Sequence, residues 1–113
     1  MKTTPDFARL LQAYFLDRLM RQQQASPHTI ASYRDTFRLL IAFVHKRLKV
    51  APSHLAVRDL DIALITAFLD HLEQERGNSA RSRNIRLAAI HSFFRYVALC
   101  EPAYGGLAQQ ILM

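Results

Sequence analysis

The stretch that decides the fold runs from Asn78 to Tyr96 and reads NSARSRNIRLAAIHSFFRY. Asn78 or Ser79 can accept hydrogen bonds from the free backbone N–H groups at a helix start. Steps of about 100° per residue place the apolar side chains on one side of that helix. This core side holds Leu87, Ile90, Phe93, Phe94 and Val97, with Ala89 and Tyr96 at its margin, and the opposite side holds Arg81, Asn84, Ala88, His91, Ser92 and Arg95. We therefore predict an amphipathic helix from Ser79 to about Cys100.

Three arginines, Arg81, Arg83 and Arg86, follow directly after this helix start. Cations are unfavourable there, because the N-terminal end of a helix carries partial positive charge. One interpretation is that a nucleic-acid backbone compensates them. The other is a solvated helix face, with Arg83 and Arg86 bonded to acids of the preceding helix. The helix pattern alone leaves both interpretations open.

The net charge of +6 is unevenly distributed along the 113 residues. Residues 1–50 hold nine Lys/Arg and three Asp/Glu, residues 51–77 hold two and five, and residues 78–113 hold four and one, which gives +6, −3 and +3. An acidic middle between two basic parts favours one basic face and a nucleic-acid partner. Acidic proteins and lipid surfaces are the other partners that such a face can bind.

Three further helices are predicted upstream. The first runs from Pro5 or Asp6 to Gln23, with Phe7, Leu10, Leu11, Tyr14, Phe15 and Leu19 as its apolar stripe. The second begins with Ser26 as N-cap and Pro27 at the first helical position and reaches Leu48. Leu55, Val57 and Leu60 pin the next connection to the core. Asp59 or Asp61 then caps a third helix that Gly77 ends, and its acidic face (Asp70, Glu73, Glu75) is expected to point away from any nucleic acid.

These elements predict an all-α fold, a four-helix bundle with a C-terminal linker or a short fifth helix. We assign residues 1–102 to one domain and residues 103–113 to a linker toward an absent catalytic domain. The segment from Ala103 to Gly106 is interpreted as a flexible joint, and Leu107–Met113 as the possible start of another apolar element.

Motifs for catalysis or for a metal or cofactor site were not found. The sequence has no glycine-rich phosphate loop, no HExxH and no CxxC, and its five histidines lack the spacing of metal ligands. No serine has an evident base beside it. We therefore expect no cofactor, no metal and no catalytic residue, and look to binding chemistry instead. A single Cys100, no signal peptide and no apolar run of about 20 residues suit a cytoplasmic protein that does not enter a membrane.

Two segments resemble a known family. SPHTIASYRDTFRLLIAFV (Ser26–Val44) and NSARSRNIRLAAIHSFFRYV (Asn78–Val97), with LDIALITAFLDHLEQERG (Leu60–Gly77) between them, closely resemble the N-terminal SAM-like, or core-binding, domain of tyrosine recombinases such as phage-type integrases. The resemblance extends from about Phe7 to Pro102. It implies a bundle that forms one jaw of a clamp around duplex DNA, with the second and fourth helices crossing the major groove.

The resemblance also implies which residues contact DNA. The second helix would contribute Ser26, His28, Thr29, Ser32 and Arg34, and the fourth would contribute Arg81, Ser82, Arg83, Asn84 and Arg86. The helix pattern places Arg34 beside the apolar stripe, where an internal acid is an alternative partner. On the polar face of the fourth helix, Arg81 and Arg95 suit phosphate or a guanine edge, and Asn84 suits an adenine edge.

By the same resemblance, the tyrosine that cuts DNA lies in a C-terminal domain that would follow Met113, so this segment is expected to bind and not to cut. The expected partners are double-stranded DNA and, in the full-length protein, other recombinase protomers, with the isolated domain a monomer. The alternative function is a helical protein–protein module for protomer assembly, in which Leu107–Met113 docks.

Overall fold

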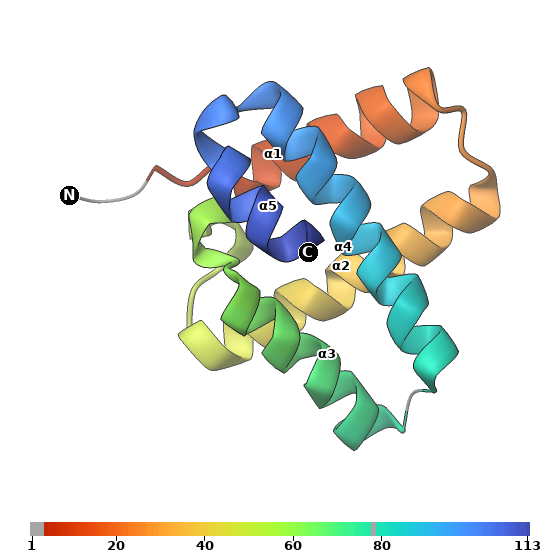
Figure 1. Cartoon of the computed structure of the whole chain (residues 1–113), viewed down its shortest axis with the longest axis vertical. Helices are drawn as coiled ribbons and strands as arrows, with labels where there is room; N and C mark the ends of the chain where they lie inside the picture. Colours follow the sequence, from red (N-terminus) through yellow and green to blue (C-terminus); the bar gives the residue numbers. More distant parts are fainter. Residues whose placement is uncertain (1–3, 78) are drawn as a thin grey trace. The chain divides into compact units, whose positions relative to one another are not determined.

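The computed structural model describes residues 4–77 and 79–113, with the backbone alone for Arg76. In these ranges the chain is helical and contains no strand, which confirms the all-α class (Figure 1). It divides into two compact units, Met1–Asp59 and Leu60–Met113. The single domain predicted for residues 1–102 stays a prediction.

The first unit contains α1 (Phe7–Ala13), η1 (Tyr14–Gln22) and α2 (Pro27–Leu48). A single helix to Gln23 was predicted, and its extent is confirmed, but from Tyr14 the backbone winds as a π-helix with hydrogen bonds from i+5 to i. This winding brings side chains five residues apart onto one side. Tyr14 and Leu19 are accordingly both buried, whereas Phe15 of the predicted stripe is only half-buried.

Aromatic rings form much of this unit's core. Tyr14 and Phe37 are fully buried, and their centroids lie 6.4 Å apart in an edge-to-face arrangement. Phe15 meets Phe37 in the same manner at 6.1 Å. Edge-to-face contact matches the positive ring edge to the negative ring face. The contacts tie the N-terminal helix to α2.

Two short 3-10 turns, η2 (Pro52–His54) and η3 (Val57–Asp59), follow α2. Leu55 and Val57 are buried, as predicted. Asp6 precedes α1 but makes no side-chain cap there; its Oδ1 accepts a hydrogen bond from the Val57 N–H at 2.9 Å. The Phe7 N–H donates to the Leu55 carbonyl at 3.1 Å. The start of α1 is therefore fastened to the end of its own unit.

The second unit begins with Leu60, which is buried as predicted, and contains α3 (Ile62–Arg76), α4 (Ala80–Cys100), η4 (Pro102–Tyr104) and α5 (Gly105–Leu112). Asp61, and not Asp59, caps α3 by accepting the Leu64 N–H at 2.9 Å. Gly77 ends α3 with a left-handed φ of 63°. The core of this unit includes the predicted stripes of both long helices: Ile65, Phe68, Leu69, Leu72, Ile90, Phe93, Phe94 and Val97.

Helix α5 corrects the flexible joint predicted at residues 103–106. These residues form η4 and the first turn of α5, and α5 packs against α4 and α3. Tyr104, Ala108 and Ile111 are buried at 7%, 2% and 3% exposure. Their burial offsets the low helix propensity of Gly105 and Gly106. The fifth helix is thus confirmed, while the linker role of residues 103–113 stays a prediction.

Two glycines of this unit should respond in opposite directions to alanine. At Gly77, φ of +63° is strained for an L-residue, so Gly77→Ala should lower the free energy of unfolding by about 1–2 kcal/mol. Gly106 lies inside α5, so Gly106→Ala should raise it by about 0.4–1 kcal/mol. A Cβ at either position meets no atom within 4 Å, which isolates the backbone effect. Urea titration followed by circular dichroism measures both, and a shared sign would contradict the explanation.

Candidate nucleic-acid interface

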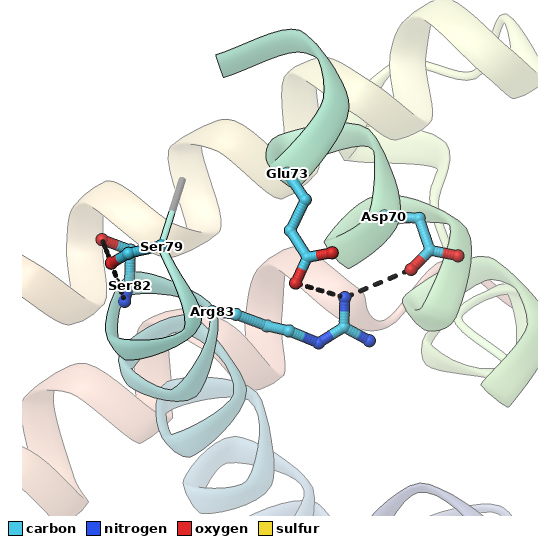
Figure 2. A network of polar contacts seen from close by, with 5 residues as sticks. All are labelled: Asp70, Glu73, Ser79, Ser82 and Arg83. Carbon is cyan, nitrogen blue, oxygen red and sulfur yellow. Dashed lines mark hydrogen bonds and ion pairs between the residues drawn. The ribbon is translucent and has the colours of Figure 1, made fainter. Parts of the chain in front are cut away.

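Helix α4 starts at Ser79, whose Oγ accepts the Ser82 N–H at 3.2 Å (Figure 2). The Ser79 hydroxyl also donates to the Ser82 hydroxyl at 3.4 Å. The other predicted cap, Asn78, lies outside the described residues. Ser82 is one of the predicted DNA contacts. It is half-buried, and its N–H and hydroxyl bond to Ser79 in the first turn of α4.

Helix α2 starts with the same arrangement of hydroxyl groups. Ser26 Oγ accepts the Thr29 N–H at 3.1 Å, and its hydroxyl donates to Thr29 Oγ1 at 3.1 Å. Pro27 occupies the first turn, where its missing N–H costs nothing. The predicted N-cap is confirmed. Each unit thus presents one long helix whose first turn is shaped by a serine and a hydroxyl three residues later.

The other predicted contacts on α2 differ in exposure. His28 and Arg34 are exposed, whereas Ser32 is half-buried and its carbonyl accepts a hydrogen bond from the buried Thr36 hydroxyl at 3.1 Å. Arg34 also borders an apolar cavity of about 530 Å³ between α2 and the N-terminal helix. Phe15, Met20, Phe37 and Ile41 are among the residues that line this cavity.

Arg83 is held by two carboxylates of α3 (Figure 2). Its Nη1 lies 3.2 Å from Asp70 Oδ1 and 3.1 Å from Glu73 Oε1. The hydrogen bond to Asp70, with the negative charge of both acids, raises the pKa of Arg83. The acidic face of α3 was expected to point away from any nucleic acid, and this stays a prediction, but two of its acids, Asp70 and Glu73, contact a residue that was predicted to bind DNA. Of the two interpretations of the arginines at this helix start, the structure shows the second for Arg83: it is bonded to acids of the preceding helix.

The exposed stripe of α4 contains Arg81, Asn84, Ala88 and Arg95, as the helix pattern predicted. Ile85 belongs to it as well, at 41% exposure. Sequence reasoning missed Ile85 because an aliphatic side chain suggests a core, although its position four residues after Arg81 was the available signal. Arg86 is half-buried, at the edge of the stripe.

Burial corrects the predicted faces of α4 at four positions. His91 and Ser92 were placed on the polar face but are half-buried, and the backbone of Ile111 in α5 bonds to His91. Ala89, placed at the margin, is fully buried, and Leu87, placed in the core, is half-buried. The docking of α5 on α4, which no local pattern shows, narrows the solvent-facing part of the helix.

His91 is expected to make the stability of the protein depend on pH. Burial lowers its pKa, the bond to the Ile111 backbone partly opposes this, and the charge of Arg95 adds to the lowering. Below the unfolded value of about 6.5, the unfolded chain binds a proton that the folded chain resists, so stability falls as the pH falls. Urea titrations between about pH 7.5 and pH 5.5 should show this loss of stability. The variant His91→Gln should lose less stability over the same range, because it lacks the titrating imidazole. Parallel losses in both proteins would exclude His91 as the source.

The described residues hold no group of three or more His, Cys, Asp or Glu placed to bind a metal ion. None of the helices in the described ranges is both long and apolar enough to cross a lipid bilayer.

Comparison with known proteins identifies the family. The family model for the phage integrase N-terminal SAM-like domain matches residues 13–99. The chain belongs to this family. It is therefore a domain of the tyrosine recombinase and integrase class, and the predicted resemblance is confirmed.

Three relatives illustrate the match to the integrase family. The chain is 56% identical to the putative integrase/recombinase y4rC of Sinorhizobium fredii over 105 residues. These residues make up 93% of the chain and 32% of that protein. It is 51% identical to y4rD of the same organism, over 93% of the chain and 37% of the relative. Tyrosine recombinase XerC of Pseudomonas syringae pv. tomato is 34% identical to the chain, and the match covers 84% of the chain and 31% of that protein. The chain thus spans about a third of the length of these relatives. No solved structure matches significantly.

Proposed function

We propose that this domain binds duplex DNA at the recombination site of a tyrosine recombinase, through helices α2 and α4. The observation that carries the proposal is the exposed stripe of Arg81, Asn84 and Arg95 on a helix whose opposite side buries Ile90, Phe93, Phe94 and Val97. Cations and an amide on one helix face are the groups that contact phosphates and base edges in a major groove.

On α4, Arg81 and Arg95 bind phosphate or a guanine edge, and Asn84 pairs with an adenine edge. Ala88 lies among them, and its small side chain allows the backbone to come close to the DNA. Ile85 extends the set, since an exposed aliphatic group can contact the methyl group of thymine. Ser82, Arg83 and Arg86 complete the proposed α4 contacts, and Arg83 can reach a phosphate only when it leaves Asp70 and Glu73.

On α2, the proposed contacts are Ser26, His28, Thr29, Ser32 and Arg34. The first turn of a helix presents free N–H groups and partial positive charge, which together bind phosphate. The capping serine and the exposed His28 lie at this turn. Arg34, two turns along, adds a full positive charge.

We place strand cleavage outside this chain. Among its tyrosines, Tyr14 and Tyr104 are buried and Tyr33 and Tyr96 are half-buried, which is unsuited to attack on a phosphodiester. The chain covers only about a third of its relatives, so a longer protein would supply the cutting groups. A cytoplasmic location of that protein is part of the proposal and is consistent with DNA as its partner.

Salt dependence tests the DNA-binding proposal. A fluorescently labelled duplex of random sequence is titrated with the domain between about 50 and 200 mM salt, and anisotropy gives the affinity. Each phosphate contact should add about 0.9 to the steepness of log K against log salt. Affinity that does not change with salt, or no binding in this range, would contradict the proposal.

A second candidate, a surface for protomer assembly, is favoured by the apolar cavity beside Arg34. Leu16 and Met20, which line it, are 49% and 50% exposed. Exposed apolar side chains that lie together are typical of protein–protein interaction sites. The tail predicted for this role is less suited to it, because Ala108 and Ile111 are already buried in the chain's own second unit. Sedimentation velocity over a concentration series tests assembly: a monomer at all concentrations would exclude it for the isolated domain.

A further inference from the structure

Arg83 occupies an unusual place for a DNA-contacting cation. Its guanidinium lies between two carboxylates of α3, with Nη1 at 3.2 Å from Asp70 and 3.1 Å from Glu73. Asp70 and Glu73 are one turn apart and therefore share a side of α3. In Figure 2 both carboxylates face the Arg83 side chain across the gap between α3 and α4. Two adjacent residues of α4, Ser82 and Asn84, belong to the proposed DNA contacts.

The helix dipole explains why this arrangement is stable. The first turn of α4 contains no acidic residue, although acids are favoured there. Asp70 and Glu73 bring negative charge to this end of the helix from a neighbouring helix. They neutralise a cation that would otherwise repel the helix N-terminus.

The same ion pairs remain accessible to a competing anion. The side chains of Arg83, Asp70 and Glu73 are 30%, 51% and 41% exposed. Ion pairs of this exposure are weak, because water screens them and the long side chains lose freedom when they pair. A DNA phosphate offers the guanidinium an equivalent anionic partner with similar geometry.

We propose that Asp70 and Glu73 are positioning residues of the DNA site: they withhold Arg83 from phosphate, so DNA must displace them to engage it. The proposal rests on the proposed function. It implies that the domain binds DNA more weakly, and with a shallower salt dependence, than its arginines would allow. The carboxylates and the phosphate compete for one guanidinium.

The test measures duplex affinity against salt for variants of the intact chain. Asp70→Asn with Glu73→Gln keeps size and hydrogen bonding but removes the negative charge. This variant should bind several-fold more tightly, and its log–log salt dependence should steepen by about 0.9, the value for one added phosphate contact. Adding Arg83→Gln to it should abolish both changes.

Glu75→Gln is the matched control, because Glu75 is an exposed acid of the same helix outside these ion pairs. It removes one negative charge, so it is compared directly with each single change, and twice its logarithmic gain in affinity is the charge effect expected in the double variant. Thermal melts monitor folding, and if the double variant melts early, the single changes Asp70→Asn and Glu73→Gln should each give part of the gain.

The outcomes separate this inference from the proposed function. If the unaltered chain shows no salt-dependent binding, the proposed function fails and the inference fails with it. If the unaltered chain binds but the double variant gains no more than twice the logarithmic gain of Glu75→Gln, only the inference fails. A gain that survives Arg83→Gln also overturns it, since the gain would then not pass through Arg83.

Discussion

Replacing Phe93 with alanine is expected to lower the free energy of unfolding by about 3–5 kcal/mol. Phe93 has no exposed surface, and its ring meets that of Phe94 edge-to-face with centroids 5.5 Å apart. The truncation removes buried apolar area, the contact with the neighbouring ring and the packing around both. The loss is large beside the total stability of about 5–15 kcal/mol that is typical of a domain. The substitution should therefore remove a large part of the free energy that keeps the protein folded.

Leu99→Ala provides the matched control for this prediction. Leu99 lies on the same helix but is 68% exposed, so its truncation should change stability by no more than about 0.5 kcal/mol. Urea titration followed by helical circular dichroism gives both values. Equal effects at the two positions would mean that the core side of α4 is wrongly assigned.

The second large effect is expected in DNA binding and depends on the proposed function. Arg81→Gln with Arg95→Gln removes the two outermost cations of the exposed stripe of α4. Loss of two phosphate contacts should reduce the log–log salt dependence by about 0.9 for each. If either arginine pairs with a guanine edge, its loss should cost about 1–3 kcal/mol of discrimination, at least several-fold in affinity for the preferred sequence.

Lys46→Gln with Arg47→Gln is the control of equal charge change. Both residues are exposed in the last turn of α2, where cations complement the negative end of the helix dipole. These changes should reduce DNA affinity only through net charge. Equal losses in the two double variants would show that α4 contributes charge without specific contacts, and would remove the basis for the contact assignment.

Together the two predictions assign stability to the buried face of α4 and DNA binding to its exposed face. The Phe93 variant should lose stability, and whatever it loses in DNA binding should follow from unfolding. The Arg81 and Arg95 variant should keep its melting temperature within a few degrees, because exposed substitutions rarely change stability much. Circular dichroism and anisotropy on the same samples distinguish the two effects.

Local features of the fold could be predicted from the sequence. Ser26, Asp61 and Ser79 cap the helices where their patterns indicated, and Gly77 ends α3 in the left-handed conformation. These features depend on hydrogen bonds within about four residues and on backbone sterics, which neighbouring residues determine. The buried stripes followed for the same reason, since helix periodicity alone decides which side chains share a face.

The candidate site was predictable only in part. The exposure of Arg81, Asn84 and Arg95 follows from the periodicity of α4. The exposure of Ile85 was not predicted, because an aliphatic side chain suggests a core position. Its place in the helix, four residues after Arg81, instead puts it on the exposed side. A helix pattern states which residues share a side but not how much of that side a neighbour covers.

For the stretch from residue 78 to 96, the sequence by itself determined a capped amphipathic helix with a buried aromatic side and a basic side. The tertiary structure decided which of its charges are available: Asp70 and Glu73 hold Arg83, and α5 covers His91. It also decided that Asp6 binds Val57 and does not cap its own helix. The reason is physical: caps and periodicity arise between near neighbours in the chain, whereas these contacts join residues that only packing brings together.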